Sequence, residues 1–583
     1  MDASQVAVHG KELKHYDPAR AWVTSATGIA SLTAIALFAL LLISNAPTLT
    51  HPFIPGSDYA ADILATQRAA HGLLLTGHPS VAGFNHPGPF FLYFRILAQW
   101  LIGDLTATVF GAHLVGVFAC SALFAGLFAA LLHGLARQEG ADDRTATIAA
   151  LGALAVILMQ FGTIGAPGDD FVPRVAFARG VLSNIWMPDV LILPFLTFLT
   201  AALLALRGST FGLIAATGTA GALVHGYIML PPIVGPVWLI TALLARRARR
   251  AVTGQDFSGP TWLAVIGIIT LFALPLLLDA VLHPPGNIAL ALATAVDRRV
   301  SAPSPPLLTL VRFLCHQWWD VRPGLWAAIP LGLAICAATH RHRAVCRGTF
   351  LLLSLVAATA LLAFTQTPWR LPPFSARFFL ATALLPIALG VLFALLALQR
   401  NQGRLGASTA AALVFLFPLT TPLYLPYRGA DGIDRAARAI AAEVPPGSQI
   451  ALSSAGGQGA PSTIGASVIN LRTTGASAIN LSTTGANGID PNLSARHIPV
   501  IAGVLLDLDR FGIVSCAQEP IPFYYSAERI CAQPLPPGTP VYQIDVVVCP
   551  ADPPPPFERV GSGIMIMPVA GRRDCVQIVP APR

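Results

Sequence analysis

Long apolar stretches, each near the length needed to cross a bilayer, follow one another through the first three quarters of this chain. The 583 residues are 54% hydrophobic and only 11% charged, whereas a soluble domain carries about 25% charged residues. The surplus indicates lipid-facing helix surface, and at roughly 20 apolar residues per span it predicts an α-helical polytopic membrane protein with about 11 transmembrane helices. The predicted spans are 23–45, 106–135, 146–162, 188–206, 211–227, 228–245, 260–283, 325–339, 348–365, 378–398 and 406–424.

Basic residues are concentrated in alternate segments between these spans. If the N-terminal segment 1–22 is cytoplasmic, the inside segments hold 15 Lys or Arg in 65 residues and the outside loops hold 10 in 138. This bias follows the positive-inside rule. It predicts a multi-pass protein of the bacterial inner membrane, with a cytoplasmic N-terminus and, after an odd number of spans, a periplasmic C-terminal domain. The inside segments are 1–22, 136–145, 207–210, 246–259, 340–347 and 399–405, and the outside loops are 46–105, 163–187, 284–324 and 366–377.

Residues 428–583 have an organisation of their own after the transmembrane part, residues 23–427. Their short apolar runs between turn residues predict a small α/β or α+β domain. Within it, residues 463–492 repeat a ten-residue Gly-, Thr- and Asn-rich unit, which favours a flexible loop; a polar loop that touches sugar is the alternative. Predicted helices cover 432–444 and 497–510, and predicted strands cover 449–452, a segment near 513, 541–548, 564–567 and 576–579.

Four cysteines fall in this C-terminal domain, at Cys516, Cys531, Cys549 and Cys575. Because disulfides persist in exported proteins, an even number of cysteines there predicts two disulfides, and three pairings remain open. Zinc binding is the weaker alternative, since the sequence contains no C-x-x-C pair.

The loop between the first two spans, residues 46–105, contains the strongest functional pattern. Ser57 is a suitable N-cap for a helix that begins at Asp58. The helix dipole favours the ionised form of Asp58 in the first turn, and Asp62, four residues later, shares its helix face. A carboxylate that stays ionised at the membrane surface can accept a proton from a sugar hydroxyl.

The same loop continues with the turn His86-Pro87-Gly88-Pro89 and then with the aromatic segment Phe90–Ile102, which Arg95 and Gln99 interrupt. An apolar stretch this short does not reach across a bilayer. It predicts a helix that lies in the membrane interface.

These features together resemble the glycosyltransferase C superfamily. An N-terminal span, an Asp-led helix, a Lys/His-Pro-x-x turn and a juxtamembrane aromatic helix are similar to the polyprenyl-phosphate-sugar-dependent transferases, such as the protein O-mannosyltransferases and the aminoarabinose transferases of lipid A. Two later segments, Trp186 through Phe195 and Ala376 through Phe379 with Pro386 downstream, are similar to bacterial members. The resemblance covers residues 20–400 in architecture through short motifs, and the C-terminal domain matches loosely.

The resemblance implies an inverting transfer on the outer side of the membrane. It places the family's catalytic carboxylate on Asp58, which would deprotonate the acceptor hydroxyl while polyprenyl phosphate leaves the anomeric carbon. The leaving phosphate needs positive charge or hydrogen-bond donors. The candidates for binding substrate are Arg377, then Arg370 and His86, with Asp62 beside them. Family members often have Lys where His86 stands, and this departure puts the phosphate role of His86 in doubt.

Each candidate also has a structural interpretation. Asp58 could be an ordinary helix-starting acid, Asp62 is expected to be a solvated or structural neighbour of the base, and Arg95 is expected to snorkel to lipid headgroups. No cofactor is predicted with certainty; Asp169 and Asp170 could hold a divalent metal, but a solvated turn is preferred. The remaining structural interpretations are Arg370 and Arg377 as partners of lipid phosphates, His225 as a satisfied helix-end histidine, and Trp318 and Trp319 as an interfacial aromatic belt.

Two classes of function remain. The first is a glycosyltransferase that moves a sugar from a polyprenyl-phosphate donor to a lipid, glycan or protein acceptor of the cell envelope. The second is a transporter or flippase for a lipid-linked intermediate. Transporters place ionisable residues near the bilayer midplane, and the predicted spans contain almost none, which favours the enzyme over the transporter. A non-catalytic family member is a third alternative. Nucleic acid is not an expected partner, because the net charge of +8 is dispersed among loops.

Overall fold

A computed structural model of the chain describes most of residues 25–402 and shorter pieces of the C-terminal part. Within the first part, the residues outside this description are 51–56, 68–73, 79–83, 107–108, 163–180, 183–186, 302–305, 322–325, 327, 331–341 and 366–372. After residue 402, the described residues are 437–438, 440–442, 444, 446, 448–454, 508, 513–517, 541–548, 558–560, 563–566 and 574–580.

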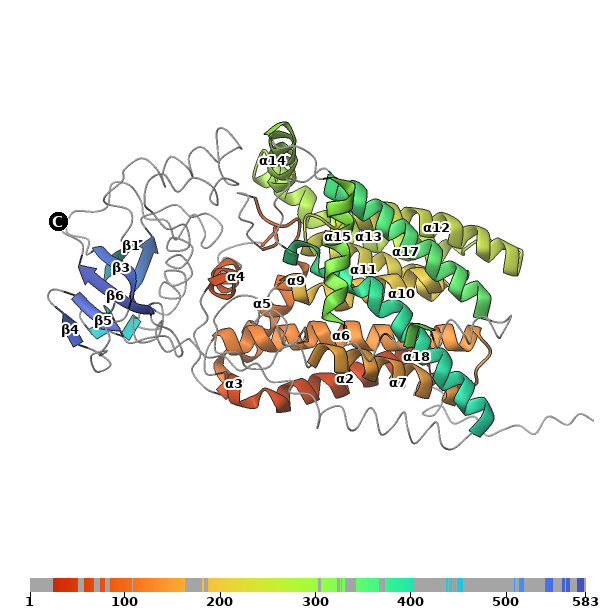
Figure 1. The fold of residues 1–583 in the computed structure, drawn as a ribbon. Helices are drawn as coiled ribbons and strands as arrows, with labels where there is room; N and C mark the ends of the chain where they lie inside the picture. Colours follow the sequence, from red (N-terminus) through yellow and green to blue (C-terminus); the bar gives the residue numbers. More distant parts are fainter. Residues whose placement is uncertain are drawn as a thin grey trace, which may run out of the picture.

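The chain is an α-helical polytopic membrane protein whose long helices form one bundle (Figure 1). Among the described residues, seven helical stretches are long and apolar enough to cross a membrane. The helices are α2 (Ala26–Ser44), α3 (Ala46–Thr50), α4 (Ser57–Gln67), α5 (Phe90–Ile102), η2 (Gly103–Leu105), α6 (Val109–Gln138), α7 (Asp143–Gly162), α9 (Met187–Val190), α10 (Ile192–Ala205), α11 (Thr210–Gly226), α12 (Pro231–Thr253), α13 (Gly259–Leu282), α14 (Asn287–Ser301), α15 (Leu307–His316), η3 (Gln317–Asp320), α17 (Arg343–Thr365), η6 (Pro373–Phe379) and α18 (Leu380–Gln402).

Most of the predicted spans correspond to these helices. The seven long apolar stretches coincide with seven of the predictions. The predicted spans 211–227 and 228–245 coincide with α11, which has 17 residues, and with α12, which ends in an Arg-rich turn. The other two, 325–339 and 406–424, lie largely outside the described residues, so the total of 11 stays a prediction. The predicted interfacial helix has the bounds of α5.

Helix α6 lies at the centre of the bundle and contacts α2, α5, α7 and α10. Every residue of α10 is buried, whereas α13 buries only three of its residues, so α10 belongs to the core and α13 faces lipid. Helices associate in lipid through close packing at small residues. A Cβ at Gly126 of α6 would lie 2.3 Å from the carbonyl oxygen of Ala30 in α2, so a side chain there would push these two helices apart.

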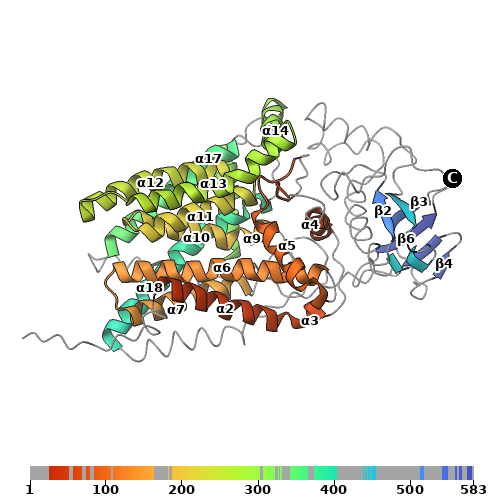
Figure 2. The same ribbon diagram turned by 180° about the vertical axis from the view of Figure 1, so that it is seen from behind.

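The two ends of the bundle differ in composition. Arginines gather where α6 and α12 end, at the turn between α10 and α11, and where α17 begins. Helices α3, α4, α5 and α9 lie at the opposite end, and the strands lie beyond that same end in both views (Figures 1 and 2). This separation agrees with the arginine pattern on which the predicted topology rests.

Reporter fusions should place the two ends of the bundle on opposite sides of the membrane. We expect a phosphatase that is active only in the periplasm to be inactive when fused after Arg250 and active when fused after Arg583. Arg250 belongs to the Arg-rich end, which the positive-inside rule assigns to the cytoplasm, and Arg583 ends the domain predicted to be periplasmic. Activity in intact cells, divided by the abundance of each fusion, measures this. A cytoplasm-active reporter at the same positions is the control and should give the opposite pattern. An active phosphatase after Arg250 would reverse the topology.

The C-terminal part contains a six-stranded mixed sheet with the order β2-β1-β3-β6-β5-β4. Strand β1 pairs in parallel with β2 and β3, and the pairs β3–β6, β6–β5 and β5–β4 are antiparallel. A parallel pair needs a crossover connection, and the predicted helix 497–510, of which only residue 508 is described, lies in the β1–β2 connection. The strands are β1 (Gln449–Ser454), β2 (Val514–Ala517), β3 (Val541–Val548), β4 (Glu558–Val560), β5 (Gly563–Ile566) and β6 (Asp574–Pro580).

The apolar alternation predicted every strand except β4. This three-residue strand contains Glu558 and Arg559 and so shows no apolar period; its pairing with β5 across a two-residue connection creates it. In the predicted helix 432–444, the described residues 437–438 and 440–442 are helical. The repeat at 463–492 lies outside the described residues.

The order of the strands in the sheet excludes one of the three possible disulfide pairings. Cys516 lies in β2 and Cys575 in β6, three strands apart, whereas Cys531 and Cys549 lie outside the described residues. Neighbouring strands are about 4.8 Å apart, so three spacings give roughly 14 Å, and cysteines with Cα atoms more than about 7 Å apart cannot be bridged. We therefore expect Cys516 to pair with Cys531 or Cys549, and never with Cys575.

Mass mapping of the non-reduced, alkylated protein tests this pairing. Within the C-terminal domain, the expected products are two cross-linked peptide pairs, either Cys516–Cys531 with Cys549–Cys575 or Cys516–Cys549 with Cys531–Cys575. Cys120 and Cys315 are free in the structure and should be alkylated once the protein is denatured, which makes them the internal control. Alkylated thiols at the four C-terminal positions would contradict both the disulfides and the export of this domain.

Candidate functional site

Three ionisable side chains of the first loop meet in a buried group, called the loop cluster below. Asp62 of α4, His78 of the following loop and Arg95 of α5 are each less than one-tenth exposed. Arg95 Nη1 donates a hydrogen bond to Asp62 Oδ2 at 2.9 Å, and His78 Nδ1 donates one to Asp62 Oδ1. The loop cluster therefore ties α4 to α5 and to the intervening loop through a single carboxylate.

The protonation states within the loop cluster follow from burial and from attraction between its members. Burial raises the pKa of Asp62, but attraction to His78 and Arg95 outweighs it and holds the pKa below its ordinary value. Burial lowers the pKa of His78 despite attraction to Asp62. At neutral pH, Arg95 is thus the counter-charge of Asp62, and His78 is neutral. Because His78 donates from Nδ1, its Nε2 is unprotonated; this atom is buried and has no hydrogen-bond partner among the described residues.

The loop cluster corrects two expectations from the sequence. Arg95 does not snorkel to lipid: it is 1% exposed and is paired with Asp62. Asp62 is not solvated either, although its role as a structural neighbour fits the structure. The reason is that α5 packs against α6 and α4 covers it, so the polar side chains between them face each other. Sequence reasoning missed His78, although the loop contains three His-Pro pairs, at His51, His78 and His86.

The His86-Pro87-Gly88-Pro89 turn is fixed by backbone hydrogen bonds. Gly77 N donates to His86 O at 2.8 Å, His86 N donates to His78 O at 2.7 Å, and Gly88 N donates to His225 O at 3.1 Å. A Cβ at Gly88 would lie 2.4 Å from the imidazole of His225, so the turn can approach the end of α11 only because this residue is glycine. The turn is therefore a rigid part of the site.

The side chain of His86 cannot supply positive charge at neutral pH. Burial, reinforced by the nearby His78, lowers the pKa of His86 to about 3. Its Nδ1 accepts a long hydrogen bond of 3.4 Å from Ile228 N, which places the proton on Nε2. His86 can thus donate a hydrogen bond to a phosphate oxygen but cannot pair with it as a cation, which removes part of the role expected for it.

A second set of contacts holds the same loop from the other side. Asn85 N donates to Asn287 Oδ1 at 2.7 Å, and Asn287 Nδ2 donates back to Asn85 O at 2.8 Å. Asn287 N in turn donates to Asp279 Oδ2 at 2.7 Å. Asp279, the acid near the outer end of a predicted span, is therefore a structural acceptor at the junction of α13 and α14.

Arg377, the first candidate for phosphate binding, already has an acidic partner. Its Nε donates to Asp189 Oδ1 at 3.1 Å, and Asp189 is completely buried. Asp189 lies in α9 and Arg377 in η6, so this ion pair joins the two later segments that resemble the transferases. Met187 of α9 also lies against the loop cluster, with its Sδ 3.9 Å from Arg95 Nη2. Three segments far apart in sequence thus meet at one end of the bundle.

The other candidates are placed as follows. Asp58 lies in the first turn of α4, as predicted. Arg370, Asp169 and Asp170 lie outside the described residues, and the described part of the chain contains no group of three or more His, Cys, Asp or Glu residues suited to a metal ion. The helix-end histidine has the expected partner, and one tryptophan stacks on an aromatic side chain of η6, while the aromatic belt stays a prediction. These are His225, whose Nε2 donates to Phe272 O at 2.7 Å, and Trp318, which stacks on Phe379 and donates to Thr382 Oγ1 at 3.1 Å.

Comparisons with known proteins give only distant similarities. No protein-family model and no curated protein sequence matches the chain. Among solved structures, ArnT from Cupriavidus metallidurans bound to undecaprenyl phosphate is similar, with 14% sequence identity, a TM-score of 0.49, and coverage of 96% of this chain and 100% of the other. The same protein in the apo state has 12% identity, a TM-score of 0.47, and coverage of 97% and 100%. At this identity and TM-score the likeness does not establish a shared function.

Proposed function

We propose that this protein is a membrane glycosyltransferase that takes a sugar from a polyprenyl-phosphate donor and transfers it, with inversion, to an acceptor of the cell envelope. One observation carries the proposal. The Asp-led helix with its His-Pro turn, the segment around α9 and the segment around η6 each resemble the glycosyltransferase C superfamily in sequence, and they assemble around two buried ion pairs at one end of the bundle.

Asp58 is the proposed general base. It takes the proton of the acceptor hydroxyl as the hydroxyl oxygen forms a bond to the anomeric carbon. The bond between that carbon and the phosphate oxygen breaks, and the phosphate leaves with the electron pair. The loop cluster contributes by position: the paired Asp62 lies one helical turn after Asp58 and anchors α4, so the backbone that carries Asp58 is held against α5.

The departing phosphate is the proposed ligand of Arg377. Its guanidinium is held on one side by Asp189, which orients it, and an arginine can donate to a phosphate through more than one nitrogen. His86 contributes at most a hydrogen bond from Nε2. Arg370 remains a second cationic candidate. Donors aimed at developing negative charge are usually the largest contribution to such a transfer.

The position of the ionisable groups in the membrane-spanning helices favours a transferase over a transporter. In the described helices long enough to cross the membrane, the acidic, basic and histidine side chains lie near the helix ends, as His113, His133, Asp189, Asp279 and Arg347 do. A proton- or ion-coupled transporter needs such groups near the bilayer midplane. The chemistry available to this protein is therefore concentrated at the membrane surface, where a transferase needs it.

A transfer assay tests this function. Purified protein should release polyprenyl phosphate from polyprenyl-phosphate sugars when an envelope extract supplies acceptors, because transfer and carrier release are one step. Chromatography of the radiolabelled carrier measures the release, and omission of the extract is the control for spontaneous hydrolysis. If no donor of this class is consumed while vesicles containing the protein move the intact donor between leaflets, the flippase replaces the transferase.

A further inference from the structure

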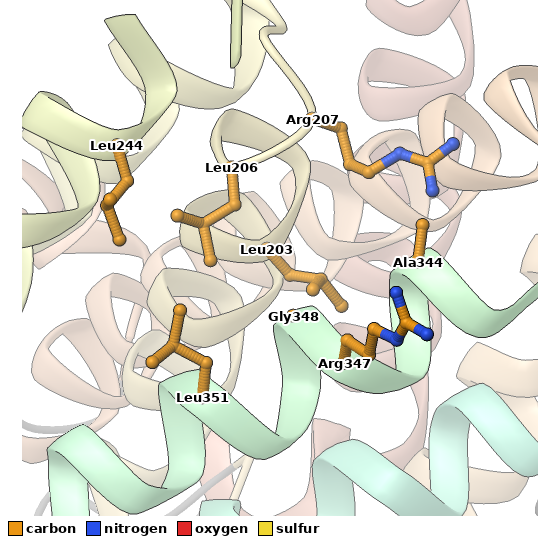
Figure 3. A pocket seen from close by; sticks show the side chains of 8 residues that line it. All are labelled: Leu203, Leu206, Arg207, Leu244, Ala344, Arg347, Gly348 and Leu351. Carbon is orange, nitrogen blue, oxygen red and sulfur yellow. The ribbon is translucent and has the colours of Figure 1, made fainter. Parts of the chain in front are cut away.

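A crevice lies between α10, α12 and α17 at the Arg-rich end of the bundle (Figure 3). Its volume is about 300 Å³. One side is apolar and the other carries two guanidinium groups. The apolar side chains are Leu203, Leu206, Leu244 and Leu351, and the cations are Arg207 and Arg347. Helix α10 lies between this crevice and Asp189. At 1.5 Å of rise per residue, Arg207 is on the order of 27 Å along the helix axis from Asp189, so the crevice is distinct from the candidate transfer site.

The positive charge of the crevice is only partly balanced. Arg207 Nη2 pairs with Glu139 Oε1 at 3.0 Å, and its Nη1 is buried without a hydrogen-bond partner among the described residues. His342 bonds the other oxygen of Glu139 at 2.7 Å, so Arg207 is held in place by a buried anchor. Arg347 is exposed, and no ion pair in the described part of the chain includes it. A ligand with negative charge would therefore be attracted.

The crevice opens toward the surface that faces lipid. Leu351 at its edge is 47% exposed, and the neighbouring Phe350 and Leu243 are 76% and 56% exposed. Both α10 and α17 belong to the helices that are apolar enough to cross a membrane. The two arginines lie where these helices end or begin, which is the depth of lipid headgroups.

We propose that this crevice binds an anionic membrane phospholipid, with its phosphate at Arg207 and Arg347 and part of one acyl chain against the leucines. Basic pockets between transmembrane helices bind anionic headgroups, and arginine matches phosphate geometry better than lysine does. The volume is at the lower limit of about 300 Å³ for ligand pockets, enough for a chain segment but not for a whole lipid. Such a lipid would brace α10 against α17 independently of the proposed sugar transfer.

Native mass spectrometry of the delipidated protein tests the site. We expect phosphatidylglycerol to bind at least tenfold more tightly than phosphatidylcholine with the same chains. Arg347→Gln should remove most of that difference, because it deletes a charge without breaking an ion pair. Arg343→Gln is the matched control: Arg343 is exposed and lies one helical turn before Arg347 on α17, but it does not line the crevice, so binding should be unchanged.

Four results would overturn the proposal: equal binding of the two lipids, equal losses in the two variants, displacement of phosphatidylglycerol by millimolar inorganic phosphate, or preferential displacement by polyprenyl phosphate. The last two would assign the site to a free anion or to the donor lipid. Photo-crosslinking of the unmodified protein by phosphatidylglycerol with a diazirine in its chain does not depend on any variant. The labelled peptides should contain Leu203–Leu206 or Leu351, and labels confined to other helices would exclude the crevice.

Discussion

Asp58→Asn is expected to lower the rate of sugar transfer by about 10²- to 10⁴-fold, the usual contribution of a general base. The amide keeps the shape of the side chain but cannot take up the proton of the acceptor hydroxyl. Donor binding should change little, because the proposed base acts on the acceptor. Release of polyprenyl phosphate, measured at saturating and at limiting donor, separates these effects: the maximal rate should fall and the donor KM should stay within about twofold.

The matched control for Asp58→Asn is Asp143→Asn. Asp143 also lies in the first turn of a helix, α7, but it belongs to the Arg-rich end of the bundle, where it pairs with Arg137 at 2.9 Å. Both substitutions remove a negative charge from a helix N-terminus, which is worth about 0.3–1 kcal/mol of helix stability. Only Asp58→Asn should affect transfer. Parental rates in both variants, at equal abundance in the membrane, would remove Asp58 as the base.

Asp62→Ala is expected to destabilise the protein by about 3–5 kcal/mol, because it leaves the buried guanidinium of Arg95 without its counter-charge. The carboxylate also accepts the hydrogen bond from His78, so its loss removes the acceptor of two buried hydrogen bonds. The thermal unfolding of the detergent-solubilised protein should shift to lower temperature, and the amount of folded protein recovered from membranes should fall.

A double variant distinguishes charge imbalance from loss of packing. Asp62→Leu combined with Arg95→Met replaces the pair by apolar side chains of similar volume, so it should recover much of the stability that either single substitution loses. Asp256→Ala serves as the exposed control, since Asp256 pairs with Arg246 and Arg250 at the surface and should change the unfolding temperature little. If the double variant were as unstable as the two single losses added together, the two groups would not act as a pair.

These stability effects decide how the site variants are interpreted. Loss of Arg377 removes an ion-pair partner of the fully buried Asp189, just as loss of Arg95 removes an ion-pair partner of Asp62. A low transfer rate in an Arg377 variant therefore has to be compared with the rate of Asp189→Asn, which breaks the same ion pair but keeps the guanidinium. A much larger loss in the Arg377 variant would report on phosphate binding. The same reasoning makes Asp62 a poor control for Asp58, although the two residues share a helix face in the sequence pattern.

Much of the architecture could be predicted because membrane spans and strands are encoded locally. Apolar stretches of spanning length and the distribution of arginines depend only on the solvent that each segment meets. The bounds of α5 and β3 follow in the same way from a short apolar run between breakers. Strand β4 could not be predicted, because its pairing depends on a neighbour and its own residues contain no apolar period.

In the candidate site, too, some features could be predicted from the sequence and others could not. The sequence by itself determined that a carboxylate begins α4, that a His-Pro turn follows, and that charged residues avoid the middle of the spans. Only the tertiary structure decided that Arg95 turns inward to Asp62, that His78 completes the loop cluster, and that Asp189 is the partner of Arg377. The physical reason is that a side chain's period shows which face of its own helix it occupies, whereas its counter-charge comes from another segment, up to 188 residues away, and pairs with it only after the helices pack.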